Sequence, residues 1–173
     1  MESPNRVKAS VTSRTGEAGP GYEAIRVRDP FVVVIFGASG DLSKRKLVPA
    51  LYHLDRAGYL PERFAVVGFS RTEMSDEQFR DGMLAEIRES VKDGGAEVSA
   101  DNRLVRALHY QPGNADQPES FRRLRERLEA LEKELDLPGN RLFYLSVAPE
   151  FFSTIVENLD GAGMIQERSD PTW

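Results

Sequence analysis

Apolar residues along this chain follow two patterns: short continuous runs, and longer stretches in which they recur every three or four positions. Residues 31–36 and 64–69 are continuous runs rich in β-branched residues, which is typical of strands covered on both faces of a parallel sheet. Two further runs, the first of them more amphipathic, cover residues 104–110 and 142–147. The pattern therefore predicts four strands.

Between and after these strands, the apolar spacing predicts four helices. The first covers residues 41 to about 58, where Pro49 predicts a kink or a later start because proline lacks an amide. The second begins after Ser75, which can form a capping box with Gln78, and the third begins near Pro118. The third stripe spans only about two heptads, which favours packing on a sheet over a coiled coil. The predicted stripes are Leu47, Leu51 and Leu54; Phe79, Met83, Ile87 and Val91; Phe121, Leu124, Leu128, Leu131 and Leu135; and Phe152, Ile155 and Leu159.

This alternation of strand and helix indicates an α/β fold, in which right-handed crossovers wind a parallel sheet. Residues 1–29 are rich in Ser, Gly, Glu and Arg and show no apolar period. Such a composition buries too little surface to offset chain entropy, so we expect a flexible tail there. We expect one domain over residues 30–173.

Composition excludes several classes of protein. The chain has 173 residues with 23 Lys and Arg against 28 Asp and Glu, a net charge of −5 that argues against general nucleic-acid binding. With no cysteine there is no disulfide, thiol nucleophile or thiolate-held metal. The longest apolar run, residues 31–36, is far short of the roughly 20 residues that span a bilayer, and residues 1–30 contain no secretory apolar segment. We expect an intracellular protein without a membrane partner.

The segment between the first strand and the first helix carries most of the chemical information. Gly37 would allow a tight turn, and Gly40 would let the backbone approach a ligand closely. Amides at the helix start would then point toward an anion such as a phosphate. A G-x-x-G pair is a weak signal and does not complete the G-x-G-x-x-G motif, but the strand before it and the helix after it favour a nucleotide site.

Three cations, at positions 44–46, lie in the opening turns of that helix, where the macrodipole disfavours each by about 0.3–1 kcal/mol. Bound phosphates would reverse this penalty. We favour a ligand contact for Lys44 and solvent exposure for Arg45, while Asp41 has an equally good explanation as a helix cap.

The residue after the second predicted strand bears on the choice of coenzyme. An NAD site would present Asp or Glu to the ribose 2′-hydroxyl at this strand end, whereas this chain has Arg71 after Ser70. A guanidinium can hold a 2′-phosphate that a carboxylate would repel. NADP is therefore preferred to NAD, the alternative being a solvent-exposed turn arginine.

Three separated segments resemble the glucose-6-phosphate dehydrogenase family: Gly-Ala-Ser-Gly-Asp-Leu-Ser-Lys-Arg-Lys-Leu-Val-Pro-Ala-Leu at 37–51, Gly-Tyr-Leu-Pro at 58–61 with Val-Gly-Phe-Ser-Arg at 67–71, and Asn-Arg-Leu-Phe-Tyr-Leu-Ser-Val-Ala-Pro at 140–149. The resemblance covers about residues 31–165. It implies a Rossmann-like, doubly wound parallel sheet, incomplete relative to the whole family enzyme, that binds NADP.

The resemblance also implies roles for particular residues. Arg71 would bind the 2′-phosphate, and Tyr144 would line the coenzyme pocket, although a core tyrosine is an equally good interpretation. Ser43 replaces an alanine usual in the family, a small change that should not abolish binding. The residues expected to cradle the pyrophosphate and its ribose are Gly37, Ala38, Ser39, Gly40, Asp41, Leu42, Ser43 and Lys44.

Family members continue into a strand with Glu-Lys-Pro-Phe-Gly and a large domain whose Asp-His pair supplies the general base, and neither motif occurs in these 173 residues. We expect neither His53 nor His109 to replace that base, so we assign no catalytic residue and no metal ligand. The isolated chain should therefore be inactive and bind NADP weakly, if at all.

By this resemblance the whole enzyme would be cytoplasmic and homo-oligomeric, and would oxidise glucose 6-phosphate to 6-phosphogluconolactone with reduction of NADP in the oxidative pentose phosphate pathway. An alternative is a non-catalytic nucleotide-binding or regulatory module derived from that enzyme. A short-chain reductase is disfavoured because none of the five tyrosines is followed by lysine four residues on.

Overall fold

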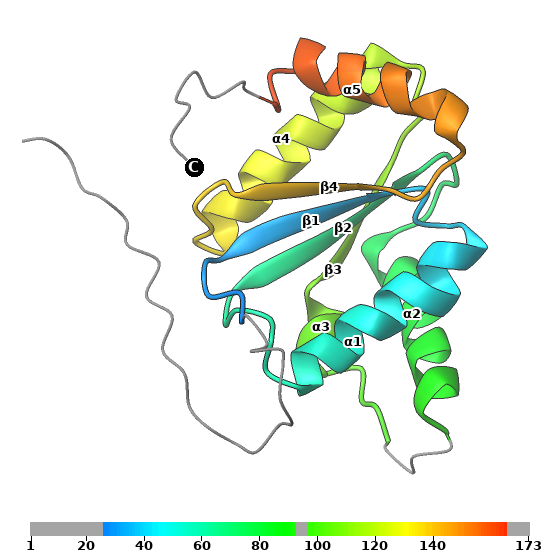
Figure 1. Ribbon diagram of the computed structural model, residues 1–173, viewed down its shortest axis with the longest axis vertical. Coiled ribbons are helices and arrows are strands. Elements are labelled where there is room, and N and C mark those ends of the chain that lie inside the picture. The colour runs from blue at the N-terminus through cyan, green and yellow to red at the C-terminus, as the bar shows by residue number, and fades with distance from the viewer. Residues whose placement is uncertain (1–25, 93–96, 166–173) are drawn as a thin grey trace, which may run out of the picture.

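The computed structural model describes residues 26–92 and 97–165, which form an α/β fold of three layers (Figure 1). Its centre is a parallel sheet of four strands in the order β3-β2-β1-β4. The strands are β1 (Phe31–Phe36), β2 (Phe64–Ser70), β3 (Leu108–Pro112) and β4 (Arg141–Leu145). The predicted α/β class and parallel sheet are confirmed, whereas most of the tail predicted for residues 1–29 lies outside the described residues.

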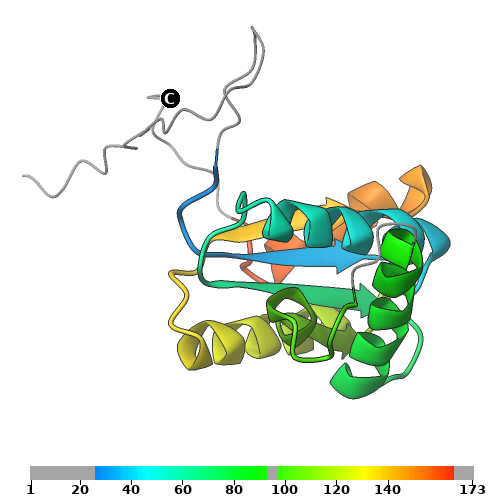
Figure 2. The ribbon, with the colours of Figure 1, turned by 90° about the horizontal axis from the view of Figure 1, so that it is seen from below.

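Helices cover both faces of this sheet (Figures 1 and 2). One face carries the π-helical turn η1 (Ser43–Leu47) with α1 (Val48–Arg56), α2 (Asp76–Val91) and the short α3 (Arg103–Arg106). The other face carries α4 (Pro118–Glu134) and α5 (Phe152–Gly161), the latter preceded by the 3₁₀ turn η3 (Pro149–Phe151).

The continuous apolar run of β1 is explained by its central place in the sheet. Val33 and Ile35 pack into the core beneath α1 and α2, while Val32, Val34 and Phe36 pack into the core beneath α4 and α5. Both faces of the strand are buried, so no polar alternation is present. The predicted apolar stripe of α2 is buried in the first of these cores, and that of α4 packs into the second. The capping box of Ser75 and Gln78 is confirmed.

Strand β4 differs from β1 because it lies at the edge of the sheet. Leu142 and Tyr144 lie in register with Val33 and Ile35, on the face that α1 and α2 cover elsewhere. Leu142 is 57% exposed and Tyr144 43% exposed, so the described helices leave this part of the face uncovered. The strand also begins one residue earlier and ends two residues earlier than the predicted range of 142–147.

The helix after β1 contains a local change of winding. Residues 41 and 42 are helical, the Val48 amide then bonds to the Ser43 carbonyl five residues back, and α1 begins at Val48 with Pro49 in its first turn. The wider turn accommodates the missing proline amide, so the predicted later start is correct. The buried side of α1 runs through Val48 and Tyr52, and the predicted burial of Leu54 is wrong because it lies off this side and is 42% exposed.

The third predicted strand is wrong in its first half. Residues 103–106 form α3, because the Asn102 side chain accepts a hydrogen bond from the Leu104 amide at 2.9 Å and caps a helical turn. Strand β3 begins only at Leu108. Leu104 and Val105 are buried as a strand would bury them, so their apolar character alone did not distinguish the two structures.

Candidate coenzyme site

The candidate site lies at the carboxyl end of β1, where the order of the strands reverses. From β1 the chain moves to β2 and β3 on one side of the sheet and then crosses to β4 on the other. In open α/β sheets such a switch point leaves a crevice between the diverging loops, and ligands bind there. The loop containing residues 37–40 occupies this position (Figure 1).

Gly37 sets the path of that loop. Its φ is +79°, and a Cβ at this position would lie 2.2 Å from the carbonyl oxygen of Ser146. Its amide bonds to the Phe69 carbonyl at 2.9 Å, and the Ser146 amide bonds to the Phe36 carbonyl at 3.0 Å. The turn is therefore held between the ends of β2 and β4, in a conformation and a space that only glycine fits.

The helix that follows the loop presents free donors. Gly40 acts as the first acceptor, since its carbonyl bonds to the Lys44 amide at 3.1 Å. The backbone amides of residues 41–43 donate to no other group among the described residues. The Ser43 hydroxyl is buried and donates to the Gly37 carbonyl at 3.1 Å, so this residue braces the loop instead of facing a ligand. Free amides and the positive end of the helix make this corner suitable for an anion.

The side chains around these donors differ in their contacts. The Arg45 guanidinium lies 3.6 Å from the Asp41 carboxylate, and both side chains are exposed, so Asp41 does not cap the helix. Lys44 is half-buried and its ammonium makes no hydrogen bond or ion pair with another described residue. Leu42 is exposed, whereas the methyl group of Ala38 is buried in the core beneath α1 and α2. Ala38 can therefore meet a ligand only through its backbone.

Arg71 is placed beside this corner by the residue before it. The hydroxyl oxygens of Ser70 and Ser39 are 2.7 Å apart, which ties the end of β2 to the glycine loop. Arg71 is exposed, and it has no side-chain partner within the described ranges. A guanidinium without a protein partner, next to free helix amides, gives the corner a net positive charge.

Tyr144 lies on β4, one strand away from the loop, in register with Ile35. Its ring is partly exposed on the face of the sheet that carries η1 and α1. It is therefore available to a ligand on that face, and the alternative of a buried core tyrosine is wrong.

The two histidines of the chain lie away from this corner. His53 is exposed on α1, and its ring contacts the edge of Tyr52. His109 lies on β3, where burial lowers its pKa below the usual value despite a hydrogen bond from Nδ1 to Asp76 at 3.2 Å. The carboxylate can only accept a hydrogen bond at this contact, and the Arg80 guanidinium lies 3.5 Å from the same nitrogen. Neither histidine is placed to act on a substrate at the glycine loop.

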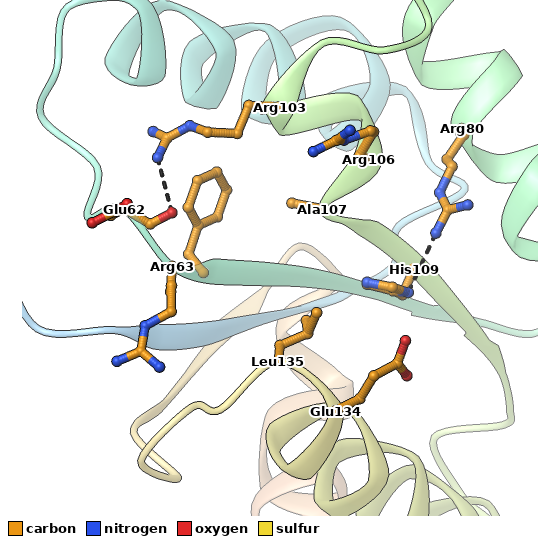
Figure 3. Close-up of a pocket in the computed structure, with 10 residues that line it drawn as sticks. Glu62, Arg63, Arg80, Arg103, Arg106, Ala107, His109, Glu134 and Leu135 are labelled. Atoms are coloured by element: carbon orange, nitrogen blue, oxygen red, sulfur yellow. Dashed lines mark hydrogen bonds between the residues drawn. The ribbon is translucent and has the colours of Figure 1, made fainter.

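A separate cavity of about 400 Å³ opens at the other end of the sheet, near the starts of β2 and β3 (Figure 3). Four of its lining residues are arginines, but three already have partners. Arg63 pairs with Asp136, Arg103 pairs with Asp55, and Arg80 donates to the Leu108 carbonyl at 2.7 Å. Arg106 alone makes no hydrogen bond or ion pair with the described part of the chain.

Residues 26–92 and 97–165 include neither a helix suited to a bilayer nor a cluster suited to a metal ion. No helix there combines the length and the apolar character needed to cross a bilayer. No group of three or more acidic or histidine side chains is arranged to hold a metal ion.

The sequence pattern missed the hydroxyl groups that connect the loop to the neighbouring strands. Ser70 is hydrogen-bonded to Ser39 and lies 3.1 Å from the hydroxyl of Tyr110 on β3, and Thr72 donates to Ser39 at 3.3 Å. Serine and threonine near strand ends are common, so no sequence signal identified these contacts. The position of Ser70 directly before Arg71 was the only available indication.

Comparison with known proteins gives a consistent result. The family described as "Glucose-6-phosphate dehydrogenase, NAD binding domain" matches residues 34–172. The glucose-6-phosphate 1-dehydrogenase of Chlamydia muridarum is 40% identical over 144 residues, which are 83% of this chain and 28% of that protein. The Leuconostoc mesenteroides enzyme of the same name is 35% identical over 136 residues, covering 79% of this chain and 27% of that one.

Solved structures show the same similarity. A glucose-6-phosphate dehydrogenase in complex with its substrate glucose 6-phosphate superimposes with a TM-score of 0.67 and 31% identity, over 81% of this chain and 29% of that one. Glucose-6-phosphate 1-dehydrogenase from Mycobacterium avium gives 0.63 and 27%, over 81% of this chain and 28% of that one. The chain thus spans less than a third of the relatives it matches. It belongs to the family of glucose-6-phosphate dehydrogenase NAD binding domains, with their Rossmann-like fold.

Proposed function

We propose that this chain is the NADP-binding part of a glucose-6-phosphate dehydrogenase. The observation that carries the proposal is Arg71, which has no side-chain partner among the described residues and follows Ser70, whose hydroxyl is hydrogen-bonded to Ser39 in the glycine loop, next to the free amides of residues 41–43. A dinucleotide pyrophosphate suits those amides, and a 2′-phosphate suits the guanidinium. NAD offers no group that would neutralise Arg71.

Within this proposal, the loop residues Gly37, Ala38, Ser39 and Gly40 offer backbone and hydroxyl contacts to the pyrophosphate and its ribose. Asp41 and Leu42 contribute their free amides, Ser43 braces the loop, and Lys44 adds a positive charge. Tyr144 supplies an aromatic wall on the α1 side of β4.

In the proposed reaction of the whole enzyme, glucose 6-phosphate is oxidised to 6-phosphogluconolactone. The nicotinamide C4 of bound NADP would supply the acceptor for the hydride that leaves C1 of the sugar. The proton of the C1 hydroxyl must pass to a base, and the placement of both histidines argues against either for this task. We therefore assign coenzyme binding to this chain and proton removal to residues outside it. A cytoplasmic location and homo-oligomeric assembly remain predictions from the family.

The proposal is tested by titrating the chain with NADP and with NAD by calorimetry, for wild type and Arg71→Ala. We expect the variant to raise the Kd for NADP by about tenfold to a hundredfold, because charged hydrogen bonds contribute about 1.5–3 kcal/mol, and to leave the Kd for NAD unchanged. Arg45→Ala is the matched control. It removes a guanidinium from the same corner, but one that already forms an ion pair with Asp41. Equal NADP affinity in wild type and Arg71→Ala would remove Arg71 from the site and contradict the proposal.

A further inference from the structure

Four hydroxyl groups next to the glycine loop form a closed chain of hydrogen bonds. Thr72 Oγ1 donates to Ser39 Oγ at 3.3 Å, and Ser39 Oγ lies 2.7 Å from Ser70 Oγ. Ser70 Oγ lies 3.1 Å from the phenol oxygen of Tyr110, which in turn donates to the backbone carbonyl of Thr72 at 2.7 Å. Donation from the Thr72 hydroxyl through Ser39 and Ser70 to Tyr110, and from Tyr110 to the Thr72 carbonyl, gives each of the four hydroxyls an acceptor.

Tyr110 is the rigid member of this chain. Only 4% of its surface is exposed, and its ring packs against that of Phe79 with centroids 5.0 Å apart. Its backbone is fixed as well, because its amide donates to the Asp76 carboxylate at 2.8 Å and its strand pairs with β2 opposite Gly68. The phenol oxygen therefore has a fixed place in the core, while the other three hydroxyls lie at the end of β2 and on the loops around the site.

This fixed oxygen lies against the backbone on both sides of Arg71. It is 2.7 Å from the Thr72 carbonyl and 3.2 Å from the Ser70 carbonyl, so the residues before and after Arg71 share one anchor. The Arg71 side chain itself has no partner among the described residues. The position of its backbone therefore determines which region the guanidinium can reach.

We propose that Tyr110 is a positioning residue for NADP: its hydroxyl holds the backbone around Arg71 so that the guanidinium meets the 2′-phosphate, and it thereby sets the preference for NADP over NAD. This inference rests on the proposed function. Burial raises the pKa of Tyr110 above its usual value, and the nearby Glu73 carboxylate acts in the same direction. The phenol thus keeps its proton at neutral pH and remains a donor.

The substitution Tyr110→Phe removes the hydroxyl and keeps the ring in the core. The net contribution of one hydrogen bond is about 1 kcal/mol, so we expect the Kd for NADP to rise about fivefold. The Kd for NAD, which lacks the 2′-phosphate, should change less than twofold. The matched control is Tyr52→Phe, which removes the hydroxyl of another buried tyrosine in the same core. The Tyr52 hydroxyl makes no hydrogen bond with another described residue.

A double-mutant cycle separates positioning from a general loss of stability. In the Arg71→Ala background, Tyr110→Phe should no longer affect NADP binding, because its effect passes through the guanidinium. Equal losses for NADP and NAD, or the same loss in both backgrounds, would overturn the inference and leave Tyr110 a structural residue.

A measurement without coenzyme distinguishes failure of this inference from failure of the proposed function. Amide hydrogen exchange of residues 71–73 in the full chain should become faster in Tyr110→Phe and remain unchanged in Tyr52→Phe. Unchanged exchange at these residues would refute the anchor even if NADP binds. Wild type that binds NAD as tightly as NADP would refute the proposed preference for NADP and the coenzyme role of Tyr110, whereas faster exchange would still establish the backbone anchor.

Discussion

The two ends of the sheet both concentrate cationic side chains, but they use them differently. At the cavity near the starts of β2 and β3, Arg63, Arg80 and Arg103 are engaged by carboxylates or carbonyls of the protein itself. At the carboxyl ends of the strands, Lys44 and Arg71 have no such partner in the described structure, and free helix amides lie beside them. Paired arginines stabilise the fold, whereas unpaired cations next to free donors indicate an anionic ligand.

This comparison also shows that a hollow is a poor guide to function when it is considered alone. The cavity has the volume for a small ligand, yet most of its charge is already neutralised within the protein. The corner formed by residues 37–43 lies at a topological switch point, where open α/β sheets bind ligands, and the amides of residues 41–43 have no partner there among the described residues.

The largest effect is expected for Gly37→Ala, which changes the residue that sets the path of the candidate coenzyme loop. The positive φ costs about 1–2 kcal/mol for alanine, and the new Cβ would clash with the Ser146 carbonyl, so we expect a loss of about 3 kcal/mol or more in unfolding free energy. Urea denaturation measures this loss, and NADP binding should disappear with it.

Gly82→Ala is the control for this substitution, because Gly82 lies in α2 with no atom within 4 Å of the new Cβ. It should increase stability by up to about 1 kcal/mol through helix propensity. A stable Gly37→Ala chain that still binds NADP would show that the loop is not fixed as described.

A smaller effect, a pH dependence of stability, is expected at the other end of the sheet. Burial is the largest cause of the lowered pKa of His109, whose ring faces Asp76 and Arg80 on α2 and shares Asp76 with Arg127 on α4. The unfolded chain, with a pKa near 6.5, then binds the proton more readily than the folded chain. Unfolding free energy should therefore fall as the pH drops through about 6.5, until the folded histidine is protonated as well.

Urea midpoints at pH 7.5, 6.5 and 5.5 measure this dependence. His109→Gln should flatten it, whereas His53→Gln, at the exposed histidine of α1, should leave it unchanged. If wild type and His109→Gln lose stability equally over this range, the pH dependence belongs to other groups.

The smallest effect is expected for Arg106→Ala, which sharpens the comparison because Arg106 is the one arginine of the cavity without a partner in the described part of the chain. It is exposed, so unfolding free energy should change by less than about 0.5 kcal/mol. The Kd for NADP should also stay the same, in contrast to Arg71→Ala. Weakened NADP binding in Arg106→Ala would indicate that the coenzyme binds at the cavity, near the starts of β2 and β3, and would contradict the proposed site.

Sequence patterns predicted those parts of the fold that depend on periodicity and local chemistry. Residues close together in the chain determine three of these features: the apolar runs of β1 and β2, the capping box at Ser75, and the effect of Pro49 on the first helix. The start of β3 was missed because Leu104 and Val105 are buried in either conformation, and a single capping contact from Asn102 decides between them.

The geometry of the candidate site was predictable to the same extent. Gly37 and Arg71 were identified from their places after two strands, and tertiary structure then brought those strand ends together. The role of Tyr110 depends on the register of β3 against β2, which pairs residues 42 positions apart and has no signature in the sequence. Contacts that depend on such register could not be foreseen from local patterns.

The uncovered side of β4 affects how the protein behaves in solution. An edge strand presents unpaired peptide groups, and here it also carries the exposed side chains of Leu142 and Tyr144. Two molecules that meet along this strand could extend each other's sheets, so preparations of the chain alone should tend to self-associate as concentration rises. A charged residue in place of Leu142 would oppose that pairing without touching either buried core.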